Sequence, residues 1–134
     1  MRRIEVTSER VVQALDVTEL ITAHDWPDGW LILSVPHTTA ALILGESDPE
    51  MLEDYEKVAV GLPAPFEPFR HHRNDNPNAA AHIISSFAGT QLILPIVESQ
   101  VVLGTWQRII LIELDGPKTR TILCGSAVAA AVED

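Results

Sequence analysis

The 134-residue chain carries 9 basic and 19 acidic residues, and its formal charge of -10 disfavours partners with anionic backbones or headgroups. We therefore expect neither nucleic acid nor a membrane surface as a partner, although a local basic pocket could still bind a small anion. The composition, 46% hydrophobic and 21% charged, predicts a single globular domain over residues 1–134 with a tail at 126–134.

Alternation and β-branched content predict four strands in the first half of the chain. They are residues 4–7, 11–15, 30–35 and 40–44. We expect the first two to form an opening hairpin, followed by a short helix over 19–23. Asp48 with Pro49 behind it has the pattern of a helix start, and this helix should run to about Val60.

The second half opens with three prolines and a polar run, which predict a long irregular loop over 62–76. Pro77 then marks a helix from Asn78 to about Phe87 that Gly89 ends. The remaining strands are predicted at 91–96, 100–103, 105–114 and 119–124. Together these elements predict an α+β fold, a two-layer β-sandwich-like core of about seven strands with a few short helices packed outside.

The chain has no apolar run of membrane-spanning length, and its first residues lack the apolar core of a signal peptide. We therefore expect a cytoplasmic protein. Cys124 is the single cysteine, which leaves no intrachain disulfide and no cysteine-based metal cluster.

Four of the five histidines flank the least regular parts of the chain. His37 follows a predicted strand, His71 ends the long loop, and His82 heads a polar stripe on a predicted helix. Imidazoles from separate elements could meet as metal ligands around an open position. Each could equally be a surface or hydrogen-bonded core histidine, and the residues alone do not decide between His71 and His72.

Polar residues also share faces with apolar ones. In the predicted strand 105–114, Gln107 and Glu113 lie on the face of Ile109 and Leu111, which indicates a pocket, a subunit contact or a solvated edge strand. Glu46 follows another strand and could act as a general base, orient His37, or serve as a helix-start charge.

Six motifs follow one another along the chain. They are Pro36-His37-Thr38-Thr39-Ala40-Ala41, Phe69-Arg70-His71, Asn78-Ala79-x-Ala81-His82, Leu94-Pro95, Leu103-Gly104-Thr105-Trp106-Gln107 and Glu113-x-Asp115-Gly116-Pro117. In this order they resemble the motifs of the YjbQ-like family, over residues 3–125. One departure is Gly45, where the family usually has an asparagine.

The resemblance implies a homotrimer of β-sandwich subunits with sites near the subunit boundaries. It also implies a thiamine-phosphate synthase activity, which joins a pyrimidine diphosphate to a thiazole phosphate. The family's three histidines fall on His37, His71 and His82, and its acidic residue falls on Glu46. Its aromatic-x-His pattern selects His71 over His72.

Two hypotheses follow, and the first is a transferase acting on a small phosphorylated metabolite. Its expected catalytic residues are Thr38, Thr39, Glu46, Gln107 and Glu113, and its expected phosphate contacts are Arg70, Arg73 and Arg108. A divalent metal is expected on the three histidines, since imidazole nitrogen suits zinc, copper, nickel or iron better than magnesium or calcium. Zinc comes first because of its availability and its tolerance of an open three-histidine site. The second hypothesis is a non-catalytic homotrimer that binds a metal or small ligand. Polar residues converging on the histidines would favour the enzyme.

Overall fold

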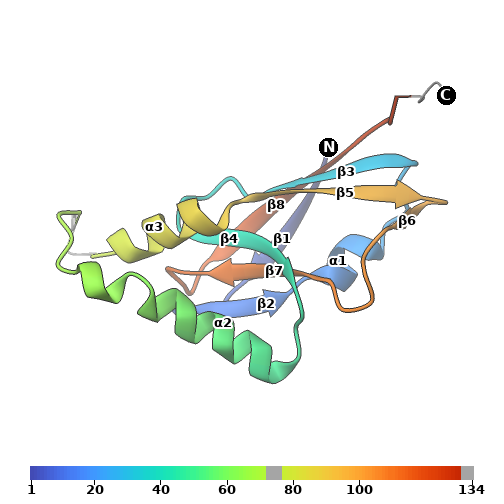
Figure 1. The fold of residues 1–134 in the computed structure, drawn as a ribbon. Helices are drawn as coiled ribbons and strands as arrows, with labels where there is room; N and C mark the ends of the chain where they lie inside the picture. Colours follow the sequence, from blue (N-terminus) through green and yellow to red (C-terminus); the bar gives the residue numbers. More distant parts are fainter. Residues whose placement is uncertain (72–76, 131–134) are drawn as a thin grey trace.

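Two antiparallel sheets stack face to face, and helices cover the outer face of the smaller sheet (Figure 1). This computed structural model describes residues 1–71 and 77–130. Its strands are β1 (Arg2–Thr7), β2 (Gln13–Asp16), β3 (Gly29–Ser34), β4 (Ala40–Gly45), β5 (Gln91–Val97), β6 (Gln100–Val101), β7 (Arg108–Glu113) and β8 (Thr119–Ala127). Its helices are α1 (Thr18–Thr22), α2 (Pro49–Gly61), α3 (Ala79–Ala88) and the 3-10 helix η1 (Ala64–Phe66).

The larger sheet has the order β1-β8-β3-β5-β6, and the smaller has the order β2-β7-β4. The predicted α+β sandwich is confirmed, with eight strands in the described residues where about seven were expected. The predicted opening hairpin is wrong, because β1 pairs with β8 and β2 pairs with β7. The intervening segment carries the chain between sheets, and Ser8 bonds to Lys118 and Glu113 there.

The main core lies between the sheets. Alternation turns Leu31 and Leu33 of β3 and Ile122 of β8 inward, where they meet Ile109 and Leu111 of β7. All five side chains are fully buried, and burying a side chain of this size stabilises a fold by about 1.5–3 kcal/mol. The hydrophobic effect therefore holds the two sheets together.

The middle strand of the smaller sheet, β7, is buried on both faces. Its other face carries Ile110 and Ile112, which pack in a second cluster with Ala59 of α2 and Ile84 of α3. The strand is thus central and not a solvated edge. It begins at Arg108, later than predicted, because residues 104–107 form a turn.

The predicted helix signals are confirmed at the start of α2 and at the end of α3. The Asp48 carboxylate accepts the Met51 N–H at 2.8 Å and caps α2, and Pro49 is the first residue of that helix. Gly89, with φ of 93°, ends α3. Strand β8 continues to Ala127, so the predicted tail begins within it. None of the helices in the described ranges is long and apolar enough to span a bilayer.

Candidate functional site

The predicted site residues divide between the two ends of the smaller sheet. At one end lie His37, Thr38, Thr39 and Glu113, and at the other lie Glu46, Gln107 and Arg108. In the β4–β7 register Ala40 is opposite Glu113 and Gly45 is opposite Arg108. Five residue steps along a strand correspond to about 17 Å, so the two groups do not form one site within a protomer.

A buried ion pair occupies the Glu113 end. Glu113 is fully buried and Arg120, on β8, is 4% exposed. Arg120 Nε donates to Glu113 Oε1 at 2.9 Å, and Arg120 Nη2 donates to the Thr39 carbonyl at 2.9 Å and hydroxyl at 2.8 Å. The pair therefore joins the two sheets and fixes the segment that carries Thr39.

Further donors surround the Glu113 carboxylate. Ser8 Oγ donates to Oε1 at 2.8 Å, and the backbone N–H groups of Leu114 and Asp115 each donate to Oε2 at 3.0 Å. Burial raises the pKa of Glu113, but the bonds from Arg120, Asp115 and Ser8 outweigh it and hold the pKa below its ordinary value. This arrangement favours a structural role for Glu113.

The lowered pKa of Glu113 predicts an acid-sensitive contribution to stability. Because the folded pKa lies below the unfolded value of about 4.3, the contribution is complete above that value and is lost as the pH falls through the folded pKa. Urea midpoints of the wild type and Glu113→Gln, measured from pH 7 to pH 2, should therefore converge on acidification. Glu9→Gln, at an exposed acid, is the control. A difference between the two urea midpoints that does not change with pH would contradict the prediction.

Arg120 is not among the predicted site residues, although the sequence contains a signal for it. It shares the inward face of β8 with the buried residues Ile122 and Cys124. A charge on such a face requires a buried partner of opposite sign. Glu113, on the same face as Ile109 and Leu111, was the matching acid.

His37 lies beside this ion pair. The Thr121 backbone N–H donates to His37 Nε2 at 2.9 Å. Burial of the ring, together with the positive charges of Arg120 and Lys118, lowers the pKa of His37, and Glu113 opposes this only in part. The neutral imidazole is therefore favoured.

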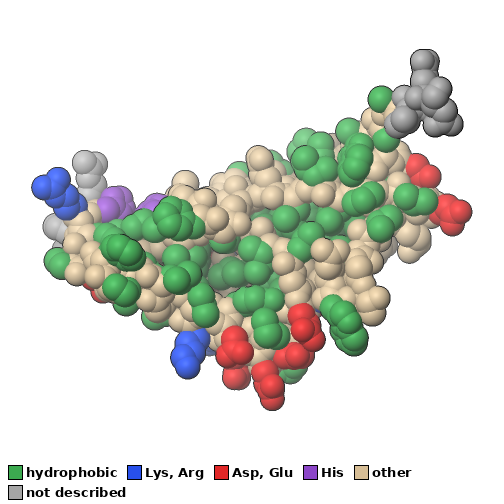
Figure 2. Space-filling view, in the orientation of Figure 1, with side chains coloured by type: hydrophobic (Ala, Val, Ile, Leu, Met, Phe, Trp, Pro, Cys, Tyr) green, Lys and Arg blue, Asp and Glu red, His purple; other side chains and the backbone are tan. Residues whose placement is uncertain are grey.

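His71 and His82 form a pair near the start of α3. Their ring centroids are 4.9 Å apart, with an interplanar angle of 83°. Figure 2 shows histidine side chains at this end of the molecule. Within residues 1–71 and 77–130, no three His, Cys, Asp or Glu side chains form a group that could hold a metal. Arg70 is exposed next to His71, whereas Arg73 and His72 lie outside the described residues.

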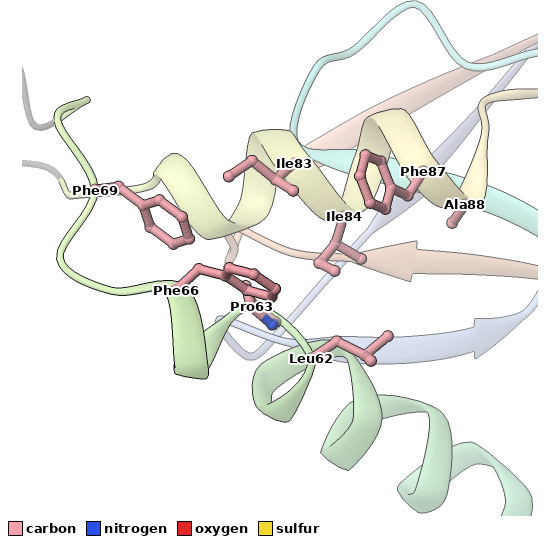
Figure 3. A pocket seen from close by; sticks show the side chains of 8 residues that line it. All are labelled: Leu62, Pro63, Phe66, Phe69, Ile83, Ile84, Phe87 and Ala88. Atoms are coloured by element: carbon pink, nitrogen blue, oxygen red, sulfur yellow. The ribbon is translucent and has the colours of Figure 1, made fainter.

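An apolar cavity of about 530 Å³ lies between the end of α2 and α3 (Figure 3). It is lined by Leu62, Pro63, Phe66, Phe69, Ile83, Ile84, Phe87 and Ala88. A second hollow of about 410 Å³ is lined by Phe69 and His71, among others. Phe69 thus separates an apolar cavity from a hollow with an imidazole in its wall.

Arg108 is engaged by carboxylates at the opposite end of β7. Its Nε donates to Asp16 Oδ2 at 2.7 Å, and its Nη2 contacts Glu19. Burial raises the pKa of Asp16, but hydrogen bonds from Arg108, Ser47 and Thr18 outweigh it and hold the pKa far below its ordinary value. The Arg108 guanidinium is therefore committed to intramolecular ion pairs.

The other predicted catalytic residues at that end have local contacts. Gln107 Oε1 accepts the Gly104 N–H at 2.9 Å, which closes the turn before β7. The Glu46 carbonyl accepts the Tyr55 hydroxyl at 2.9 Å, and the Glu46 side chain is exposed. At the other end of the sheet, Thr38 is exposed next to buried Thr39.

Comparison with known proteins gives consistent matches over nearly the whole chain. A family model described as UPF0047 protein YjbQ-like matches residues 2–127. A UPF0047 protein of Archaeoglobus fulgidus is 34% identical over 118 residues, covering 87% of this chain and 92% of that protein. UPF0047 protein YugU of Bacillus subtilis is 30% identical over 130 residues, covering 90% and 94% of the two chains.

Solved structures share the fold. The hypothetical protein APE1520 from Aeropyrum pernix K1 superposes with a TM-score of 0.84 at 34% identity, covering 95% of this chain and 97% of that one. A YbjQ-like protein of unknown function from Sulfolobus solfataricus gives a TM-score of 0.83 at 31% identity, covering 90% and 91%.

Proposed function

This chain belongs to the UPF0047 YjbQ-like family, and from that premise we propose that it is an enzyme acting on a small phosphorylated metabolite beside His71 and His82. The observation that carries the proposal is the position of this histidine pair next to the apolar cavity, with Phe69 lining both the cavity and the hollow at His71. Such a site suits a ligand with a polar end and an aromatic ring.

The polar end of the ligand is a phosphate group. Imidazole N–H groups donate to phosphate oxygens, and Arg70 supplies a cation next to His71 in an acidic chain. The apolar cavity suits the ring, since its volume of about 530 Å³ lies in the range of small-molecule pockets. Phe66 and Phe87 offer aromatic faces for stacking.

The specific reaction we propose is thiamine-phosphate synthase-like transfer. The pyrimidine diphosphate and the thiazole phosphate both combine a phosphate group with a heteroaromatic ring. Those are the two chemical features for which the histidine pair and the cavity are suited.

We further propose that the active assembly is a homotrimer. Two predicted residues with exposed side chains, Thr38 and Glu46, lie at opposite ends of the smaller sheet, whose ends are about 17 Å apart, and they can belong to one site only if neighbouring copies bring opposite ends together. A contact between two different surfaces closes into a ring when the rotation between neighbouring copies completes a full turn, and three copies then make the ring that we propose. Exposed apolar side chains on the outer face of β3 and β5 support assembly (Figure 2): Trp30, Ile32, Ile93 and Val97, at 42%, 40%, 64% and 55% exposure.

Zinc on His37, His71 and His82 remains a prediction, and the donor set in the described residues does not fit it well. Catalytic zinc sites use three protein ligands, whereas the described residues bring together two imidazoles. The lone pair of His37 Nε2 is occupied by the Thr121 N–H. We therefore assign no step of the proposed reaction to a metal ion.

The alternative is a non-catalytic trimer that binds the same ligand. Burial of Glu113 and Thr39 in a structural network favours it, because two residues expected to be catalytic are then unavailable to a ligand. Product formation from the two phosphorylated substrates distinguishes the enzyme from the non-catalytic binding protein.

Titration calorimetry with inorganic phosphate and phenyl phosphate tests the proposed site. His71→Ala and His82→Ala should each lower the affinity for both ligands about tenfold, because each removes a hydrogen bond to a charged group. The Phe87 side chain is 85% exposed. Phe87→Ala should lower the affinity for phenyl phosphate by up to about tenfold and leave the affinity for inorganic phosphate unchanged.

His24→Ala, at a histidine that packs on Trp26, is the matched control. Unchanged binding in both histidine variants would refute the site. Binding of the pyrimidine diphosphate and thiazole phosphate without product formation would favour the non-catalytic alternative.

A further inference from the structure

The tautomer of His37 is determined by a single backbone contact. The Thr121 N–H lies 2.9 Å from His37 Nε2, and a backbone N–H can only donate. Nε2 must therefore present its lone pair. A neutral imidazole with a lone pair on Nε2 carries its proton on Nδ1.

Both partners of this bond are held in place. Thr121 lies within β8 and pairs with Glu5 of β1, next to the buried Arg120. The His37 backbone N–H donates to the Val35 carbonyl at 2.9 Å, which fixes the turn that carries the ring. The ring thus has little freedom to exchange its two nitrogens.

Metal ligation by His37 conflicts with this contact at either nitrogen. A metal on Nε2 would displace the Thr121 N–H and leave that donor without its acceptor. A metal on Nδ1 would move the ring proton to Nε2, where it would face the Thr121 N–H donor. Each route costs a hydrogen bond in a partly buried place.

We propose that His37 is a neutral Nδ1–H donor for a phosphate oxygen of the ligand, and not a metal ligand. The surrounding charges fit an anion, since Arg120 and Lys118 add positive potential at the ring and Glu113 opposes it only in part. The lowered pKa of His37 supports the neutral ring. The ligand's identity rests on the proposed function, whereas the tautomer and the exclusion of metal do not.

Nitrogen NMR of the full-length protein labelled at histidine tests the tautomer, with His37→Gln used to assign the signal. At pH 7.5 we expect the protonated-nitrogen shift at Nδ1 and the lone-pair shift at Nε2. Addition of one equivalent of zinc should leave both His37 shifts in place, and His24 is the internal reference. A proton on Nε2, or a zinc-dependent shift at His37, would overturn the proposal.

Two matched variants then test the donor by titration with inorganic phosphate. Asparagine places an amide N–H near the position of Nδ1, and glutamine places an amide carbonyl near the position of Nε2. We expect His37→Gln to lower the affinity for phosphate about tenfold, and His37→Asn to lower it less than about threefold. Equal losses in the two variants would refute the donor role.

The results separate this proposal from the proposed function. If the wild type binds no phosphate, the proposed function fails and the ligand assignment fails with it, while the spectrum still decides the tautomer. If the wild type binds phosphate and His37→Gln binds it equally well, the proposed function stands and His37 has no part in it.

Discussion

Replacement of Arg120 by methionine should destabilise the fold by about 3–5 kcal/mol, because it leaves the fully buried Glu113 carboxylate without its cation. The variant also removes the bonds from Nη2 to the Thr39 carbonyl and hydroxyl. The free energy of unfolding, measured by urea titration at pH 7, gives the loss directly.

Arg108→Met is the matched control, since Arg108 is 34% exposed in its ion pairs and should lose only about 1 kcal/mol. The double variant Glu113→Leu with Arg120→Met should recover much of the loss, because apolar groups then replace both charges. If Arg120→Met costs no more than Arg108→Met, the buried pair does not stabilise this end of the sandwich as described.

Gly116→Ala should destabilise the fold by about 3 kcal/mol, because a methyl group does not fit at this position. A Cβ there would overlap the Arg10 carbonyl and would lie 2.7 Å from Ser8 Oγ and 2.8 Å from Glu113 Cγ. Thermal unfolding of the variant measures the effect. Close packing against the Glu113 side chain thus explains why glycine occupies position 116 of the Glu113-x-Asp115-Gly116-Pro117 motif.

Gly61→Ala is the control for this substitution. A Cβ at Gly61 would meet no atom within 4 Å, and Gly61 is the last residue of α2. Since alanine favours a helix over glycine by up to about 1 kcal/mol, this variant should be neutral or slightly more stable. Equal melting temperatures for Gly116→Ala and the wild type would contradict the packing argument.

The sequence predicted where the strands lie better than which strands pair. Alternation located the inward residues of β3 and β8, because burial on one face has a period of two residues. Pairing is set by contacts distant in sequence. Thr7 lies opposite Thr119, and no local pattern in residues 4–15 shows that β1 and β2 belong to different sheets.

The candidate site shows the same division. The family motifs predicted His71 and His82 as site residues, and the structure places their rings 4.9 Å apart. The engagement of Arg108 could not be foreseen, because its partner Asp16 is 92 positions away. The Thr121 N–H that binds His37 is likewise invisible to a motif, since any residue except proline supplies a backbone N–H.

The place of β8 between β1 and β3 determines when this protein can complete its fold during synthesis. Of the described strands, the one that comes latest in the chain joins the one that comes earliest to the rest of the larger sheet. Until β8 has left the ribosome, β1 has no neighbour and the β8-facing edge of β3 is open. At about 5–20 residues per second, the nascent chain spends several seconds in that state. An open strand edge can pair with another chain, so the nascent protein is exposed to such pairing until β8 emerges.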